Sequence, residues 1–217
     1  MKNVNDYDDQ VIKFPTTCPS CRMHTEVCVV EIPNLKEVII MSLNCDECGY
    51  KSNEVKGCGE ISSHGTRTTL RAETTHDMSR VVVKSDTASL AIPEIDFLQE
   101  ESGQGVACTT VEGLLMKIYD GMKQACPKDT DSSTNNDKFD TFLLELKNMA
   151  EGNRFPFTLI ITDPFSNSFV GPIPEVGQPL IVQQIEESIP DDKRITLEEF
   201  QRSRGQNDRF GLSDMKT

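Results

Sequence analysis

Two pairs of cysteines have a spacing that is typical of metal ligands. The first pair is Cys18 and Cys21, and the second is Cys45 and Cys48, which Gly49 follows. In a Cys-x-x-Cys turn both sulfurs point toward one centre, and backbone N–H groups of the turn donate hydrogen bonds to the thiolates. Two such turns supply four sulfur ligands in a tetrahedron, the arrangement that Zn²⁺ adopts in structural sites. The spacing therefore predicts one zinc ion held by these four cysteines.

A zinc ion with four cysteine ligands has no open coordination position. Neither water nor a substrate can then bind to the metal, so we expect a structural ion that is not catalytic. The alternative is two independent redox motifs of the Cys-x-x-Cys type. Each of those would normally lie at a junction between a strand and a helix, and the sequence predicts no such junction at either pair. The sequence therefore favours zinc.

The other cysteines and the histidines give weaker signals. Cys28 lies inside a predicted strand and Cys108 lies just before a predicted helix, so we expect both in the core, whereas Cys126 is expected in a loop. Cys58 and His64 together lack the glycine-rich elbow and the acidic group that would orient a nucleophile and its base. The three histidines, which are His24, His64 and His76, lack metal-site spacing. We therefore expect no catalytic residue and no enzyme.

Short β-rich runs surround the cysteines and continue beyond them. The first two runs, His24–Glu31 and Val38–Asn44, are joined by a turn with Pro33 and predict a hairpin between the two cysteine pairs. Further runs predict strands at residues 66–73, 80–84, 87–92 and 157–162. The alternation of apolar and polar residues in these runs indicates an antiparallel sheet.

Apolar residues in the middle of the chain recur with the period of a helix. One set is Val111, Leu114, Leu115, Ile118 and Met122, and Thr109 with Glu112 predicts a capping box at its start. A second set, Phe139, Phe142, Leu143, Leu146 and Met149, predicts another helix that Gly152 ends. A polar stretch at residues 126–136 separates the two, and a further helix is predicted at residues 197–202. The sequence thus predicts a mainly β fold with a small α insertion.

The charge of the chain excludes some classes of partner. Its 217 residues carry 22 Lys and Arg against 35 Asp and Glu, a net charge of −13, and mean hydropathy is −0.40. Binding to nucleic-acid phosphates or to anionic membranes needs clustered basic residues. Neither a signal peptide nor an apolar run long enough to span a membrane is present in the sequence. We therefore expect a cytoplasmic or nuclear protein whose partner is neutral or basic.

Several segments of the chain resemble the ZPR-type zinc-finger family. The resemblance is carried by residues 32–41 and 44–56 around the second cysteine pair, and by residues 65–70, 77–80, 84–88, 92–94, 109–115 and 211–217. It extends from about Phe14 to the C-terminus. Eukaryotic family members look like two tandem copies of one module, and this chain resembles the second, C-terminal copy.

The resemblance implies a domain organisation. An acidic leader at residues 1–13 would precede a four-cysteine zinc ribbon at residues 14–60. A double-stranded β-helix-like domain would follow at residues 61–182 and carry a helical hairpin at about residues 109–152. A polar segment at residues 183–217 would pack on this domain or trail from it.

The resemblance also implies a partner. Family members bind translation elongation factor 1-alpha, a basic protein, and assist its folding, with links to the cytoplasmic region of receptor tyrosine kinases and to the survival-of-motor-neuron complex. Candidate contact regions are the loop expected after the second cysteine pair, at residues 50–56, and the tip of the helical hairpin, at residues 126–136. The alternative is a nucleic-acid-binding zinc ribbon of the transcription or RNA machinery, but Glu26, Glu31 and Glu37 make the predicted hairpin mostly acidic.

Overall fold

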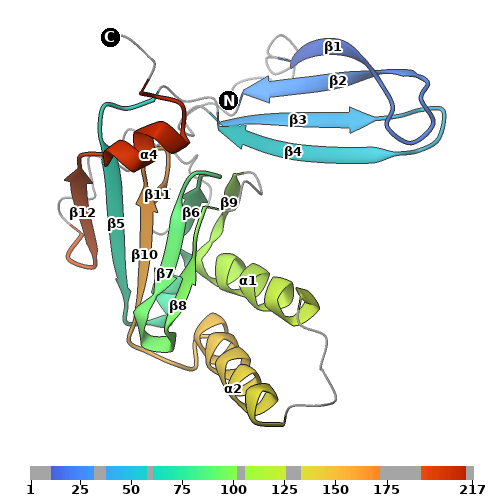
Figure 1. Cartoon of the computed structure of the whole chain (residues 1–217). Coiled ribbons are helices and arrows are strands. Elements are labelled where there is room, and N and C mark those ends of the chain that lie inside the picture. Colours follow the sequence, from blue (N-terminus) through green and yellow to red (C-terminus); the bar gives the residue numbers. More distant parts are fainter. Residues whose placement is uncertain are drawn as a thin grey trace, which may run out of the picture.

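The protein consists of a small β ribbon and a larger two-sheet domain with helices on one side (Figure 1). The computed structural model describes residues 11–31, 38–57, 61–101, 106–125, 133–171 and 192–213. Residues 126–132, the first part of the predicted polar stretch, lie outside them. Within the described part of the chain, no helix is both long and apolar enough to cross a membrane.

The ribbon is a four-stranded antiparallel sheet with its strands in sequence order. It consists of β1 (Val11–Thr17), β2 (His24–Glu31), β3 (Val38–Asn44) and β4 (Lys51–Gly57). The central hairpin of β2 and β3 has the bounds that the sequence predicts. The outer strands differ from expectation: β1 begins inside the stretch expected as an acidic leader, and β4 replaces the loop expected at residues 50–56.

The larger domain contains two antiparallel sheets. The five-stranded sheet has the order β12 (Ile195–Phe200), β5 (Gly65–Ala72), β10 (Phe157–Asp163), β7 (Ser89–Ile92) and β8 (Phe97–Gln99). The three-stranded sheet has the order β11 (Phe169–Val170), β6 (Val81–Lys84) and β9 (Ala107–Thr110). Most strands that are adjacent in space are distant in sequence, so long-range pairing holds both sheets together.

The core forms because alternate residues of the long strands are apolar. In β10 the side chains of Phe157, Leu159 and Ile161 are buried, and those between them are half-buried. They belong to one buried cluster with Leu70 of β5 and Val83 of β6, so both sheets share this core. Burying each such side chain contributes roughly 1.5–3 kcal/mol.

Two consecutive helices cover one side of the core, as the helical periodicity predicts. They are α1 (Val111–Ala125) and α2 (Ser133–Ala150), and their apolar residues Leu115 and Leu146 are buried. The cap of α1 lies one residue later than predicted, because Thr110 Oγ1 accepts the backbone N–H of Gly113 at 3.1 Å. Gly152 follows α2 with φ +72°, the left-handed conformation that ends many helices.

The helix predicted at residues 197–202 is wrong. These residues lie mostly in β12, which pairs with β5 from Ile195↔Leu70 to Phe200↔Gly65. A short helix, α4 (Arg204–Arg209), begins only after Ser203, whose side chain caps it. Pairing with a distant strand therefore overrides the local helical pattern.

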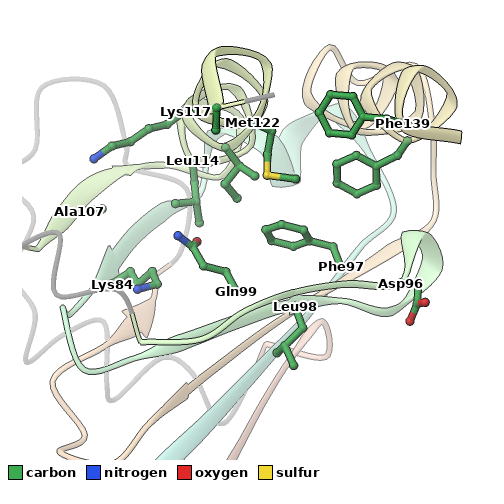
Figure 2. A pocket seen from close by; sticks show the side chains of 14 residues that line it. Lys84, Asp96, Phe97, Leu98, Gln99, Ala107, Leu114, Lys117, Met122 and Phe139 are labelled. Carbon is green, nitrogen blue, oxygen red and sulfur yellow. The ribbon is translucent and has the colours of Figure 1, made fainter. Parts of the chain in front are cut away.

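A cavity of about 600 Å³ lies between α1, α2 and the outer strand β8 (Figure 2). Apolar side chains form most of its wall, including Phe97 from β8, Met122 from α1 and Phe139 from α2. Lys84 from β6 lines it as well. The cavity thus combines a mostly apolar wall with two lysines, Lys84 and Lys117, and one carboxylate, Asp96.

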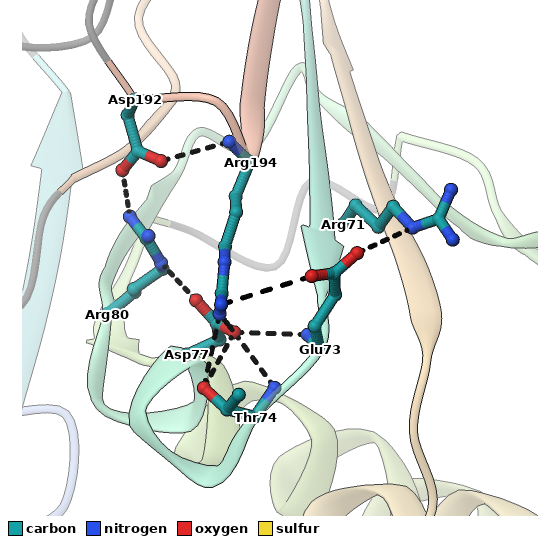
Figure 3. A network of polar contacts seen from close by, with 7 residues as sticks. All are labelled: Arg71, Glu73, Thr74, Asp77, Arg80, Asp192 and Arg194. Atoms are coloured by element: carbon teal, nitrogen blue, oxygen red, sulfur yellow. Dashed lines mark hydrogen bonds and ion pairs between the residues drawn. The ribbon is translucent and has the colours of Figure 1, made fainter.

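A network of charged residues ties the C-terminal part of the chain to the domain (Figure 3). Its centre is Asp77, in the short 3-10 helix η2 (Thr75–Ser79), whose carboxylate is 1% exposed. Arg80 Nε donates to Asp77 Oδ1 at 2.9 Å, and Arg194 also donates to Asp77. The backbone N–H groups of Glu73 and Thr74 each donate to Asp77 Oδ2 at 3.0 Å.

Burial alone would raise the pKa of Asp77. The hydrogen bonds from Arg80 and from the backbone of Glu73 and Thr74, together with the charge of Arg194, outweigh that effect and lower the pKa to about 2. Asp77 is therefore an ionised buried carboxylate with a full set of donors, which indicates a structural role.

Candidate metal centre

The four cysteines of the two Cys-x-x-Cys turns lie together at one end of the ribbon. Their sulfur atoms are all within 4.8 Å of one another. The Sγ atoms of Cys18 and Cys48 are 3.7 Å apart, and those of Cys21 and Cys45 are 3.6 Å apart. In a tetrahedron with zinc–sulfur bonds of about 2.3 Å, neighbouring sulfurs are about 3.8 Å apart. In a disulfide the two sulfurs are only about 2.05 Å apart. The spacing of the sulfurs therefore fits one zinc ion.

Each cysteine pair lies in the loop of a β-hairpin. Strands β1 and β2 pair as far as Thr17↔His24, which encloses the first turn, and β3 and β4 pair as far as Asn44↔Lys51, which encloses the second. Pairing of β2 with β3 brings both loops to the same end of the sheet. The sheet register therefore brings the ligands together.

The two turns have the same backbone hydrogen bonds. In the first, the N–H of Cys18 donates to the carbonyl of Met23 at 2.9 Å, and the N–H of Arg22 donates to the carbonyl of Cys18 at 2.9 Å. In the second, Cys45 and Gly49 make the equivalent bonds at 2.8 Å. Arg22 has φ 63° and Gly49 has φ 71°, so both turns need a left-handed residue at the same position.

Local hydrogen bonding favours the thiolate form of Cys18, whereas the pKa of Cys21 is raised to about 12 by burial and by its three cysteine neighbours. The backbone N–H of Cys21 donates to the sulfur of Cys18, and this bond is the main reason that the pKa of Cys18 falls to about 7. Cys18 and Cys45 are buried, with 1% and 2% exposure, whereas Cys48 is exposed. Bound zinc would supply a structural crosslink between the turns, with no open position for a substrate.

The two other cysteines that the structure describes lie apart from this centre. Cys28 is half-buried in β2, and Cys108 is exposed in β9, so the expectation that both belong to the core is wrong. A position in a strand or at the start of a helix does not by itself imply burial, because only one face of such an element is buried. Cys58 and Cys126 lie outside the described residues.

The histidines do not extend the metal centre. Among the residues that the structure describes, the four cysteines are the group of ligands found close enough to share an ion. His64 instead lies beside Ser62 and Ser63, and its Nε2 is 3.3 Å from Glu199 Oε1. His24 and His76 are exposed.

Sequence comparison agrees with the two parts of the fold. Residues 10–63 match the family described as the ZPR1 zinc-finger domain, and residues 76–212 match the one described as the ZPR1 jelly-roll domain. The jelly roll is the double-stranded β-helix-like domain that the sequence resemblance implies, and the zinc-finger match agrees with a single zinc ion at the four cysteines.

Relatives from distant organisms match nearly the whole chain. The zinc finger chaperone zpr1 of Schizosaccharomyces pombe is 40% identical over 96% of the chain, and the zinc finger protein ZPR1 of Homo sapiens is 35% identical over 98%. The Drosophila melanogaster zinc finger protein ZPR1 is 34% identical over 99%. These names describe zinc finger proteins and a chaperone, and none describes an enzyme.

The matched region is 44%, 44% and 45% of these relatives respectively, so the chain spans about half their length. The chain belongs to the ZPR1 zinc-finger protein family.

Proposed function

We propose that this chain is a zinc-dependent, non-catalytic protein-interaction module that binds translation elongation factor 1-alpha and assists its folding. The observation that carries the proposal is the match of nearly the whole chain to ZPR1 relatives, one of which is named a zinc finger chaperone. The resemblance of the sequence to this family implies the elongation factor as partner.

The charge of the chain supports a basic partner. A net charge of −13 attracts a basic protein over distances of about a Debye length and raises the rate of encounter. The same charge disfavours a nucleic-acid ligand, because phosphates would be repelled. The cytoplasmic region of receptor tyrosine kinases and the survival-of-motor-neuron complex are further proposed partners, and the proposed location is the cytoplasm and nucleus.

The zinc centre has a clear role in this proposal. Zinc joins the two hairpin loops of the ribbon, and metal binding to such sites is coupled to folding with free energies of roughly 10–16 kcal/mol in zinc-finger peptides. Without zinc the ribbon would therefore unfold, and any binding surface that it carries would be lost. Binding through the ribbon must then depend on an intact set of four cysteines.

Capture of purified elongation factor 1-alpha by the immobilised, zinc-loaded chain tests the proposal. The wild-type chain and Cys108→Ser should both capture the factor, because Cys108 is exposed and lies outside the metal centre. Cys45→Ser should lose capture, because it removes a buried ligand. Absence of capture by the zinc-loaded wild type, or salt-sensitive capture of RNA instead, would contradict the proposal.

A further inference from the structure

The cavity between α1, α2 and β8 runs along the free edge of a sheet. In the described part of the chain β8 is the last strand of its sheet and pairs with β7 on one side. All residues from Asp96 to Gln99 line the cavity, whereas none of β7 does. The cavity therefore lies at the β8 end of this sheet, and it reaches Lys84 of β6 and Ala107 of β9 in the other sheet.

An edge strand beside a cavity can accept another strand. The backbone N–H and C=O groups on the outer side of β8 have no partner strand among the described residues. An extended peptide can bind such an edge through main-chain hydrogen bonds, while its alternate side chains enter the adjacent pockets. The cavity supplies space for those side chains.

One end of the cavity is aromatic. Phe97 of β8 stacks on Phe142 of α2 with 6.0 Å between ring centroids, and Phe142 stacks on Phe139 at 6.4 Å. Figure 2 shows Phe97, Met122 and Phe139 around this end. Because Met122 and Phe139 are half-buried, an apolar ligand group would remove further apolar surface from water.

The other end carries a buried cation. Lys84 and Gln99 lie beside one another there in Figure 2, and Lys84 is only 6% exposed. Lys84 Nζ donates to the carbonyl of Ser85 at 3.1 Å, which uses one of its three N–H groups. It forms no ion pair with another described residue.

Three carboxylates, those of Asp163, Asp86 and Glu101, act electrostatically on Lys84, and Asp163, which acts most strongly, is already satisfied by other donors. Asp163 accepts hydrogen bonds from the hydroxyls of Ser85, Thr87 and Ser168 at 2.8, 3.0 and 2.6 Å. A ligand carboxylate in the cavity would therefore meet a partly desolvated ammonium group with donors to spare, and charge-assisted hydrogen bonds of this kind are strong.

The alternation of β8 sets the spacing of the two ligand groups. Phe97 and Gln99 are two residues apart and lie at the apolar and the cationic end of the cavity, whereas Leu98 between them is 65% exposed. A strand paired beside β8 has the same two-residue period. Its side chains at positions i and i+2 would lie next to Phe97 and Gln99.

We propose that this cavity binds an extended segment of a partner polypeptide, in which an apolar aromatic side chain and an acidic side chain lie two residues apart. The segment adds to the edge of β8, its aromatic side chain joins the row of Phe97, Phe142 and Phe139, and its carboxylate pairs with Lys84. The inference rests on the proposed function as a module that binds polypeptides.

Short fluorescent peptides test this assignment by fluorescence anisotropy. The probe carries Phe and Glu two positions apart in a strand of threonines. Matched peptides replace Glu with Gln, replace Phe with Ser, place Phe and Glu side by side, or carry N-methyl groups on the backbone. The probe should bind, and each matched peptide should bind at least about tenfold more weakly.

Two variants locate the site without unfolding the domain. Lys84→Met removes the charge but keeps an apolar stem, and should weaken the probe about tenfold while leaving the Gln-containing peptide unchanged. Gly121→Leu fills the cavity from α1, where a new Cβ meets no atom within 4 Å. Because leucine favours a helix over glycine, loss of probe binding in this variant cannot result from a weakened α1.

Lys123→Met and Gln124→Leu are the matched controls, since both residues are exposed on α1 and neither lines the cavity. They should bind the probe as the wild type does. Equal binding of all peptides, or unchanged probe binding in Gly121→Leu, would overturn the assignment. Binding of the fatty acid decanoate without competition from the probe would also overturn it. Capture of elongation factor 1-alpha that persists while the probe fails would refute this site and leave the proposed function standing.

Discussion

Arg80 and Asp192 form a partly buried ion pair between segments that are distant in the sequence. Arg80 Nη1 donates to Asp192 Oδ2 at 2.6 Å across 112 residues, while Nε of the same guanidinium donates to Asp77. The arginine side chain is 7% exposed and that of Asp192 is 22% exposed. Arg80 thus connects η2 to the segment that leads into β12.

Removing this arginine should strongly destabilise the larger domain. Arg80→Met leaves the buried Asp77 carboxylate without one of its principal donors, and breaking a buried pair from one side costs about 3–5 kcal/mol. Urea denaturation of the zinc-loaded protein measures this loss. Lys13→Met is the control, because Lys13 and Glu26 form an exposed pair with 4.0 Å between the charged atoms, and its effect should be below about 0.5 kcal/mol. Equal effects of the two variants would contradict the structural role of Arg80.

The lowered pKa of Asp77 predicts how stability changes with pH. The folded-state pKa is about 2 and the ordinary value is 3.8. Because the folded state holds the proton more weakly, this carboxylate contributes about 2 kcal/mol above pH 3.8, and that contribution is lost as the pH falls toward 2.

Asp77→Asn isolates this contribution. The difference in free energy of unfolding between wild type and variant, measured by denaturation from neutral pH down to about pH 2, should shrink across that acidic range. Glu26→Gln, at an exposed site, serves as the control. A wild-type-minus-variant difference that is independent of pH would show that the carboxylate of Asp77 is not specially stabilised in the folded protein.

The two cysteine turns differ at the position that requires a left-handed residue. Arg22 adopts φ 63° at a steric cost that Gly49, at φ 71°, does not have. Arg22→Gly should therefore be tolerated or stabilise the zinc ribbon slightly. Gly49→Ala should destabilise it by about 1 kcal/mol, and strain is the only cause because a new Cβ there meets no atom within 4 Å.

Competition with a chelator measures both effects as shifts in the apparent zinc affinity. Gly211→Ala makes the same kind of change at φ +69°, far from the cysteines in sequence, and should leave zinc affinity unchanged. Weaker zinc binding in Arg22→Gly than in Gly49→Ala would contradict the equivalence of the two turns.

The features that sequence could predict are those encoded locally. Cysteine spacing indicates the metal centre, and the apolar periodicity of residues 111–122 and 139–149 indicates α1 and α2. The hairpin of β2 and β3 is equally local, because only residues 32–37 separate its two strands in the sequence. Each of these patterns depends on residues within a short window.

Long-range pairing accounts for the errors. In β12 only Ile195 is buried and four of its six residues are exposed, so no alternating pattern distinguishes the strand from a helix. Its identity as a strand depends on β5, which lies far away in the sequence. Likewise β4 contains polar residues such as Lys51 and Asn53, and it becomes a strand by pairing with β3. The cap of α1 is Thr110 and not Thr109. Both residues are threonines, so residue type does not distinguish them, and it is Thr110 Oγ1 that accepts a backbone N–H of the first turn.

The pairing of β12 with β5 makes a steric prediction of its own. Gly65 is opposite Phe200, and a Cβ added at Gly65 would lie 2.4 Å from Cζ of the Phe200 ring. Gly65→Ala should therefore destabilise the domain by about 1–3 kcal/mol. In a Phe200→Ala background the same substitution should cost much less, because the ring is gone.

A double-mutant cycle by urea denaturation measures the coupling between these two positions. A coupling energy near zero would mean that residues 195–200 do not lie against β5, and would favour the helix that local sequence suggests. A coupling of about 1 kcal/mol or more would support the strand.

The central claim is that a closed four-cysteine zinc centre organises a binding protein. X-ray absorption at the zinc edge of the purified protein tests this claim most directly. The structure predicts one zinc per chain with four sulfur ligands at about 2.3 Å and no nitrogen or oxygen ligand. Cys45→Ser should lose this signature and Cys108→Ser should keep it. Fewer than four sulfurs, or an oxygen ligand in the wild type, would mean an open metal site and would contradict a purely structural zinc ion.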